Sequence, residues 1–256
     1  MDISEIRDLY DRQQRVEIEF PGVDKLILPD LVRFSQAGTK DNFILFSKLN
    51  ENNADQVIQD QITYFRSIGQ PFVWKLYDHD TPADLKERLI KHGFVSKEPD
   101  AVMVLDLQET PDELLSPIQA DVRLITDPDQ LIDVIKILKQ VWDRNFDWVT
   151  KRLGDDMRIP GYLNIYVAYW EGQPACAGWV FFYPKSQFAD LRGGSTVPEF
   201  RKHGLYTAVL AARVQEAIRH GYRFLVIDAS PMSRPIVASH GFKFLDYVHV
   251  CDWKPD

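Results

Sequence analysis

Residues 197–206, with the sequence VPEFRKHGLY, constrain the fold of this chain more than any other stretch. They join an apolar, β-branched run to an amphipathic segment through an Arg-x-x-Gly turn that contains Arg201 and Gly204. The first turn of a helix leaves backbone N–H groups without intrahelical partners, and the helix dipole makes that end positive. Gly204 has no Cβ, so the phosphates of a ligand can approach the backbone closely. A strand that turns into a helix in this way is typical of a phosphate-binding loop.

The side chains of the turn add positive charge. Arg201 can hold a phosphate oxygen in a forked geometry, and Lys202 adds a second cation. His203 either touches a phosphate when it is protonated or acts only as a spacer. Because a basic turn between a strand and a helix is more often solvated than ligand-binding, the surrounding elements must decide between these two interpretations.

The pattern around the turn predicts a run of alternating elements. A helix is predicted at 205–220, and its apolar stripe consists of Tyr206, Leu210, Val214, Ala217 and Ile218. Strands are predicted before it at 163–170, 175–183 and 187–197, and after it at 222–227 and 244–250. A further helix is predicted at 129–142, and a short one precedes His240-Gly241-Phe242.

This order of elements resembles the GCN5-related N-acetyltransferase (GNAT) superfamily over roughly residues 120–253. The family's loop reads Q/R-x-x-G-x-G/A. Arg201 and Gly204 match it, whereas Tyr206 stands where the family usually has Gly or Ala. The resemblance implies an α/β (α+β) fold with a mixed, mostly antiparallel sheet flanked by helices. It also implies acetyl-CoA as co-substrate, with its pyrophosphate held by loop residues Arg201, Lys202, His203, Gly204, Leu205 and Tyr206.

The first half contains a weak repeat of the second. Residues 69–74 and 221–226 share a Gly, a Phe and an apolar run, and both copies continue to a His-Gly-Phe tripeptide, at 92–94 and 240–242. Chance is the alternative explanation for so short a match. The shared order of elements predicts two GNAT-like domains: a degenerate one at 1–115 and a catalytic one at 120–256. Residues 47–53 have no glycine and little positive charge, so we expect the first domain not to bind CoA.

The resemblance also implies direct attack of an amine on the thioester. This chemistry needs a neutral amine, a positioned thioester and donors for the developing charge. By position, backbone groups of Thr196 and Val197 meet the thioester carbonyl. Asp190 lies eleven positions before Arg201, the spacing of the catalytic glutamate in histone-type members, and is the candidate general base. An Asp190 that faces solvent, and deprotonation through water alone, remain the alternatives.

The general acid is less defined. Many members use a tyrosine four residues before the Gly of the Gly-Phe pair, and that position is Val237 here. Ser230 and Ser233, near the start of the same helix, either contact the pantetheine arm or sulfur or cap the helix. We take Ser230 as the catalytic and Ser233 as the cofactor-binding candidate. Tyr206 is a further donor or packs beside CoA, and solvent can also protonate the thiolate.

Composition excludes several classes of function. The 256 residues carry a net charge of −8, which argues against nucleic-acid binding. No apolar run is long enough to span a membrane, and the acidic N-terminus has no signal-peptide pattern. Only Cys176 and Cys251 occur, without metal-ligand spacing, so we expect buried thiols, no bound metal and a cytoplasmic location.

We therefore predict an N-acetyltransferase that modifies an amine of a small molecule or peptide. The alternatives are a non-catalytic CoA-binding sensor, or an acyltransferase with a larger donor such as a longer acyl-CoA or an aminoacyl-tRNA. Aromatic and acidic residues at 142–148 either cage a cationic amine or belong to the core and its wet face. The first half either completes the acceptor cleft, covers the face of a homodimer or only stabilises the fold.

Overall fold

The computed structural model describes residues 1–36, 41–142 and 144–255. The chain forms two compact units. The first comprises Met1–Met103, Asp228–Pro235 and Phe244–Asp256, and the second comprises Val104–Ile227 and Ile236–Lys243. This division by contacts differs from a single cut at 115–120 because the last strand of the chain belongs to the first unit. The expected domains at 1–115 and 120–256 therefore remain a prediction about the repeat.

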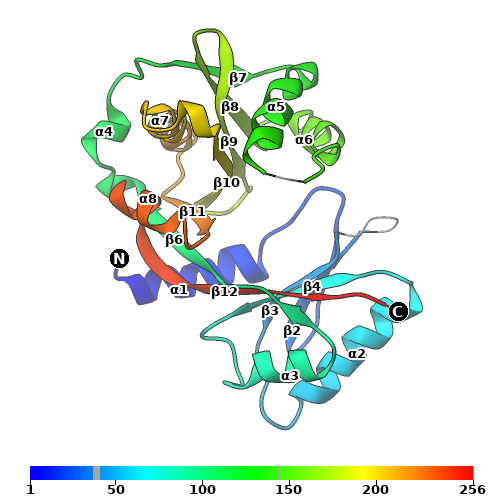
Figure 1. The fold of residues 1–256 in the computed structure, drawn as a ribbon. Helices are drawn as coiled ribbons and strands as arrows, with labels where there is room; N and C mark the ends of the chain where they lie inside the picture. The colour runs from blue at the N-terminus through cyan, green and yellow to red at the C-terminus, as the bar shows by residue number, and fades with distance from the viewer. Residues whose placement is uncertain (37–40, 143, 256) are drawn as a thin grey trace. The chain divides into compact units, whose positions relative to one another are not determined.

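The first unit has a mostly antiparallel sheet. Its strands follow the order β1-β2-β3-β4-β12, and among their pairs only β3–β4 is parallel. The strands are β1 (Asp24–Ile27), β2 (Leu31–Ser35), β3 (Phe43–Ser47), β4 (Phe72–Tyr77), the short β5 (Val95–Ser96) and β12 (Lys243–Trp253). Of β12, only Lys243 lies outside this unit. The helices are α1 (Ile3–Tyr10), a π-helix at Asp11–Val16, α2 (Ala54–Ser67) and α3 (Leu85–Lys91), as Figure 1 shows.

The core of the first unit is aromatic. Phe65 of α2 stacks on Phe72 of β4 with their ring centroids 4.2 Å apart, and Trp253 of β12 packs on Phe72 at 5.5 Å. Ile58, Ile62 and Phe65 of α2 are buried in the same core cluster. The C-terminal strand thus completes the core of the N-terminal half.

The second unit holds the predicted phosphate loop. Its strands follow the order β11-β10-β9-β8-β7, and only β10–β11 is parallel. They are β7 (Asp121–Ile125), β8 (Leu163–Trp170), β9 (Gln173–Phe182), β10 (Phe188–Thr196) and β11 (Phe224–Ala229). Figure 1 shows α7 (Leu205–Arg219) on one face of this sheet and α5 (Leu131–Val141) with α6 (Trp148–Met157) on the other.

Short elements complete the chain. They are α4 (Asp112–Leu115), α8 (Arg234–Ser239), the 3-10 turns at Leu107–Glu109, Pro128–Gln130 and Pro198–Phe200, and strand β6 (Asp100–Asp106), whose residues are divided between the units. The mixed, mostly antiparallel sheets flanked by helices confirm the predicted α+β class. Among the helices of residues 1–36, 41–142 and 144–255, none is long and apolar enough to cross a membrane.

A bulge in β10 opens the sheet of the second unit. The register with β9 shifts between Arg192 and Ser195, and β10 pairs with β11 at Phe188–Asp190, before the bulge. An extra residue bends its strand and increases the local twist. Gly193 is required here because its φ is +66° and a Cβ would lie 2.0 Å from ring atoms of Trp179. Beyond the bulge, β10 follows β9 and not β11.

Candidate active site

The loop before α7 leaves the helix N-terminus open. Gly204 is the N-cap with φ +73°, no side chain of the described residues caps the helix, and a Cβ added at Gly204 would meet nothing within 4 Å. The glycine therefore serves the left-handed backbone conformation, and the space beside it is not filled by protein. Since α7 has 15 residues, its N–H groups and its dipole favour an anion at this end.

The basic side chains of the loop are exposed, and they are anchored differently. Arg201 Nε donates to the backbone oxygen of Thr196 at 3.3 Å. The ring of His203 lies over Trp170 with their centroids 4.3 Å apart. Lys202 adopts a φ of +68°, which is uncommon for a residue with a Cβ. All three are exposed, as an interaction with a soluble anion requires.

The remaining loop residues contribute backbone rather than side chain. Leu205 is 2% exposed and lies in a core cluster with Val209 and Cys176, so only its amide is left for a ligand. Val197 is also buried, and its N–H donates to Ala175 O at 2.9 Å, which corrects the expectation that this amide meets a thioester. Because N–H directions alternate along a strand, the amide of Thr196 faces away from β9, on the edge that β11 has left.

Asp190 lies in the interior of the sheet rather than at its edge. It pairs with Phe181 of β9 and Val226 of β11 and is 16% exposed at the side chain. Arg192 donates to the same carboxylate oxygen through Nε at 2.8 Å and Nη2 at 2.6 Å. The carboxylate is thus held in one orientation just before the bulge. The alternative of a solvent-facing Asp190 at a sheet edge does not fit this position.

Sequence reasoning missed an acidic–aromatic cluster beside Asp190. We define this cluster as Asp156, Tyr162, Phe181 and Tyr183. The Tyr162 ring centroid lies 5.3 Å from that of Phe181 and 5.9 Å from that of Tyr183. Burial raises the pKa of Asp156, and burial also raises the pKa of Tyr183 well above its usual value. The one sequence signal was the i, i+2 spacing of Phe181 and Tyr183, which places both on one face of the strand predicted at 175–183.

The predicted aromatic and acidic stretch at 142–148 is divided in the structure. Trp142 Nε1 donates to Ser195 Oγ at 3.1 Å, Phe146 is buried, and Trp148 is 49% exposed. Asp143 lies outside the described residues. Arg144 of the same stretch lies over the Trp142 ring at 5.2 Å and over the Phe146 ring at 5.7 Å, so these two aromatics contact a cation of the chain itself.

Tyr206 fills a space beside the bulge. A Cβ added at Gly194 would lie 3.1 Å from Tyr206 Cε2 and 3.8 Å from its hydroxyl oxygen, so the ring covers this glycine. Val237, at the family's tyrosine position, is fully buried and carries no proton to donate. Tyr206 is therefore the phenol that the second unit places next to the open edge of β10.

Ser230 and Ser233 belong to the first unit and form a local turn. Their hydroxyl oxygens are 3.1 Å apart, and Ser230 Oγ accepts from Ser233 N–H at 3.4 Å. Ser233 Oγ also donates to Ser230 O at 3.2 Å. These bonds engage both hydroxyls in the turn that leads into α8, and among the described residues neither hydroxyl accepts a bond from an N–H of α8 itself.

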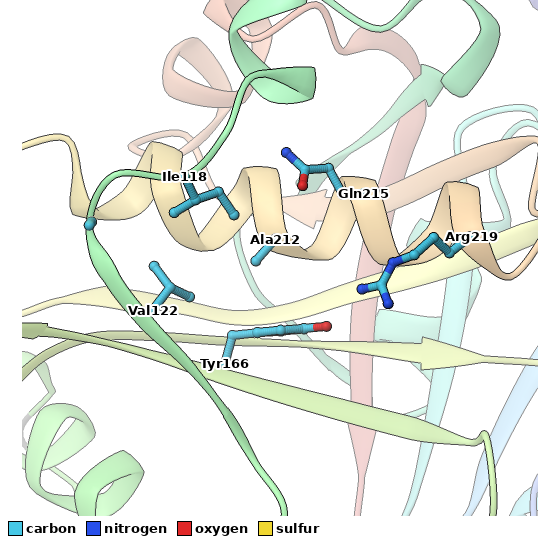
Figure 2. Close-up of a pocket in the computed structure, with 7 residues that line it drawn as sticks. Ile118, Val122, Tyr166, Ala212, Gln215 and Arg219 are labelled. Atoms are coloured by element: carbon cyan, nitrogen blue, oxygen red, sulfur yellow. The ribbon is translucent and has the colours of Figure 1, made fainter.

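A cavity of about 210 Å³ lies elsewhere in the second unit, on the flank of α7. Figure 2 shows Ala212 and Arg219 on the side of α7 that faces Tyr166 of β8 and Val122 of β7, whereas Gln215, which also lines the cavity, points away from the strands. Tyr166 donates to Glu216 Oε2 at 3.1 Å, and Gln215 Nε2 holds the oxygens of Leu114 and Ser116. The polar groups that line the cavity thus hold neighbouring segments against α7. They lie further along the helix than its N-terminal turn, where the predicted phosphate loop is.

Neither cysteine is a surface nucleophile. Both are free and buried as predicted, and burial raises the pKa of Cys176 to about 11. In the part of the chain that the structure describes, no group of three or more His, Cys, Asp or Glu side chains is arranged to hold a metal ion.

Solved structures share the fold of this chain over nearly its whole length. A GCN5-related N-acetyltransferase from Kribbella flavida matches with a TM-score of 0.71 and 11% identity, covering 99% of this chain and 96% of that one. The chain has the GNAT fold. A GNAT-family acetyltransferase from Colwellia psychrerythraea matches with a TM-score of 0.58 and 12% identity, over 98% of this chain and 95% of that one.

A two-unit relative extends the match. A tandem GNAT protein from the clavulanic acid biosynthesis pathway has a TM-score of 0.62 and 14% identity, over 99% of this chain and 95% of that one. The match to GNAT folds therefore covers both halves of the chain, and the two domains expected from the repeat remain a prediction. No family model and no curated protein matches the sequence.

Proposed function

We propose that this chain is an N-acetyltransferase that binds acetyl-CoA in its second unit and transfers the acetyl group to an amine. The observation that carries the proposal is the open N-terminus of α7 at Gly204, where neither a side-chain cap nor a packed neighbour fills the space. The amides of Gly204, Leu205 and Tyr206 would hold the pyrophosphate, and Arg201 and Lys202 would supply counter-charge.

The thioester would lie along the edge that β10 opens beyond its bulge. There the Thr196 amide would donate to the carbonyl oxygen as negative charge develops on it. The amine would approach from the α6 face, where the acidic–aromatic cluster and Asp190 lie. Asp190 would accept the proton that the neutral amine loses as it attacks, directly or through one water, and Arg192 would keep its carboxylate oriented.

Calorimetric titration with acetyl-CoA and with free CoA tests the donor site. We expect one site per chain, with a dissociation constant of about 1–100 μM. Gly204→Glu should abolish binding, because it adds bulk and like charge where the phosphates lie. Gly221→Glu is the matched control: Gly221 has φ +77° and an equally open Cβ position, but it follows the opposite end of α7. Unchanged affinity in Gly204→Glu would refute the loop assignment.

Release of CoA thiol on a panel of small amines and peptides tests the chemistry. Asp190→Ala should lower kcat by about 10²-fold and change the KM for acetyl-CoA little, as expected for a general base. Asp155→Ala is the control, since Asp155 is an exposed carboxylate paired with Arg158. A normal rate in Asp190→Ala would exclude it as the base and favour water-mediated deprotonation.

A non-catalytic CoA-binding sensor is the second candidate, favoured by the buried Val237 where the family has its tyrosine. Binding of CoA without turnover on the whole panel would support it. A larger acyl donor is the third candidate. Competition between acetyl-CoA and longer acyl-CoAs tests it, because a preferred longer chain would displace acetyl-CoA at lower concentration.

A further inference from the structure

A buried arginine lies between α7 and the sheet of the second unit. Arg213 is fully buried; its Nε donates to Val209 O at 3.1 Å and its Nη1 to Trp179 O at 3.5 Å. Its Nη2 is buried without a hydrogen-bond partner among the described residues. Gly178 makes room for it, since a Cβ there would lie 2.9 Å from Arg213 Cζ. The fold has thus been shaped around a cation.

The guanidinium has no carboxylate to balance it. In the described part of the chain no ion pair includes Arg213, whereas Arg15, the other fully buried arginine, has two. Burial lowers the pKa of Arg213, because an uncompensated charge is poorly solvated in the interior. An apolar side chain of similar length would be at least as stable at this position. The charge therefore calls for an explanation other than stability.

Tyr206 connects this cation to the open edge of β10. Both residues belong to α7, two helical turns apart, and Gly194 and Gly178 beneath them lie on neighbouring strands. Burial raises the pKa of the Tyr206 phenol, and the Arg213 cation opposes that rise. The Tyr206 ring covers Gly194, an exposed glycine in the bulge where β10 leaves β11. The other titratable groups facing Tyr206 are Cys176 and His240, whose ring centroid is 6.2 Å away. All three atoms that a Cβ at Gly194 would meet belong to Tyr206, so neither Cys176 nor His240 covers this glycine.

We propose that Tyr206 donates a proton to the leaving sulfur of the acyl donor and that Arg213 is the positioning residue that stabilises the resulting phenolate. This inference rests on the proposed function, since it needs a thioester at the bulge. It gives Tyr206 the role that the buried, apolar Val237 cannot perform. It also explains why a phenol stands at the loop position that is usually Gly or Ala in the family.

The step balances in atoms and charge. The amine nitrogen forms a bond to the carbonyl carbon, and the C–S bond breaks with its electron pair passing to sulfur. Sulfur takes the proton of the Tyr206 hydroxyl, and the phenolate stays beside the Arg213 cation. The acylated nitrogen releases one proton to Asp190 or water, and the phenolate takes one back from solvent. Because a phenol is a weaker acid than a thiol, this transfer requires a charge such as Arg213.

Titration of the bound CoA thiol tests the proposal without an acceptor. Thiolate absorbance of protein-bound CoA is followed against pH, with desulfo-CoA as the blank. We expect the pKa of the bound thiol to lie about one unit below that of free CoA. Tyr206→Phe and Arg213→Met should each return it to the value of free CoA, and Arg213→Lys should keep part of the shift. Tyr222→Phe is the control, since its hydroxyl only donates to Tyr183 O.

The outcomes separate this inference from the function it rests on. Failure of the wild-type protein to bind CoA would overturn the proposed function. Binding of CoA with a thiol pKa that neither Tyr206→Phe nor Arg213→Met changes would overturn the proton-donor role alone. In turnover with acetyl-CoA, Tyr206→Phe should lower kcat by about 10²-fold with an unchanged KM. A raised KM with an unchanged kcat would instead make Tyr206 a packing residue for CoA and also overturn the inference.

Discussion

Two arginines, one in each unit, are fully buried and are treated in opposite ways. Arg15 donates to both oxygens of Asp80 at 2.7 and 2.8 Å and to Asp11 at 2.8 Å. Burial alone would lower the pKa of Arg15, but Asp80 and the other neighbours raise it. Arg213 has only two backbone oxygens and the Tyr206 phenol, and its pKa is lowered.

The difference separates a charge that holds the structure together from a charge that can still interact with a reacting group. The Arg15 cluster, defined as Asp11, Arg15, His79, Asp80 and Asp246, satisfies its cation internally and fixes the π-helix to the turn after β4 and to β12 of the first unit. The field of Arg213 is not cancelled, so it is free to act on a charge that appears during a reaction. A buried charge that is compensated by carboxylates, such as Arg15, is expected to stabilise the fold. A buried charge without a carboxylate, such as Arg213, is expected to serve function at a cost in stability.

The largest effect is expected at Arg15. Arg15→Met should lower the free energy of unfolding by about 3–5 kcal/mol, because Asp80 would be left buried and unpaired. Chemical denaturation followed by circular dichroism measures this. Arg88→Met, at an ion pair whose carboxylates are half exposed, is the control and should change stability by less than about 1 kcal/mol. Equal losses in the two variants would show that the Arg15 cluster contributes no more than a surface pair.

The pH dependence of stability tests the same cluster. Burial lowers the pKa of His79, but hydrogen bonds to Asp11 and Asp246 dominate and raise it from 6.5 to about 9. Since the folded pKa is the higher one, the stabilisation is complete below about pH 6.5 and is lost as the pH rises through about 9. The free energy of unfolding should fall by about 1–3 kcal/mol across this window.

A matched pair of histidine variants checks this pH effect. His79→Gln should remove the fall between pH 6.5 and 9, whereas His92→Gln should retain it, because His92 pairs only with the more exposed Asp55. A wild-type curve that is flat over this window would contradict the role assigned to His79. Denaturation at a series of pH values under constant ionic strength provides the measurement.

The opposite sign is expected at Arg213. Arg213→Met should leave the protein as stable as the wild type or raise its free energy of unfolding by up to about 2 kcal/mol, since it removes an unbalanced buried charge. The same denaturation assay applies, next to the thiol titration above. A loss of 3 kcal/mol or more would mean that Arg213 is compensated like Arg15, and the comparison between the two would no longer hold.

The smallest effect is expected on the exposed side of α7. Arg219 pairs with Glu216 from a side chain that is 68% exposed. Arg219→Met should change stability by less than about 0.5 kcal/mol, because exposed pairs gain little in water. This variant is the baseline against which a gain in stability of Arg213→Met is judged. A large loss of stability in Arg219→Met would indicate that Glu216, which also accepts hydrogen bonds from Asn164 and Tyr166, depends on Arg219.

Local periodicity predicted most of the elements. The strands expected at 163–170, 175–183 and 187–197 correspond to β8, β9 and β10, and the helix expected at 205–220 corresponds to α7. These segments follow repeating patterns that a short window reveals. The same reasoning found Gly204 and the open helix N-terminus, since both depend only on neighbours along the chain.

Long-range placement was less accessible. The predicted stripe of α7 included Ile218, which is 39% exposed, and omitted Arg213 and Glu216, which are buried. Two hydrogen-bond partners of the buried Glu216, Asn164 and Tyr166, come from β8, which helical periodicity within α7 does not reveal. The acidic–aromatic cluster was missed for the same reason, since Asp156 and Tyr183 are brought together only by the packing of α6 on the sheet. The bulge, too, depends on a register that sequence periodicity does not reveal.

The pairing of β12 with β4 has a consequence for the order in which the protein forms. Val248 to Trp253 leave the ribosome only after all of the second unit, yet they are the partners of Phe72 to Tyr77. The N-terminal half must therefore wait, with the Phe65–Phe72 stack lacking Trp253, while the segments of the other unit emerge complete. During synthesis from the N-terminus, the first unit is therefore completed only after the second. A nascent chain stalled before residue 244 would expose an unfinished aromatic core.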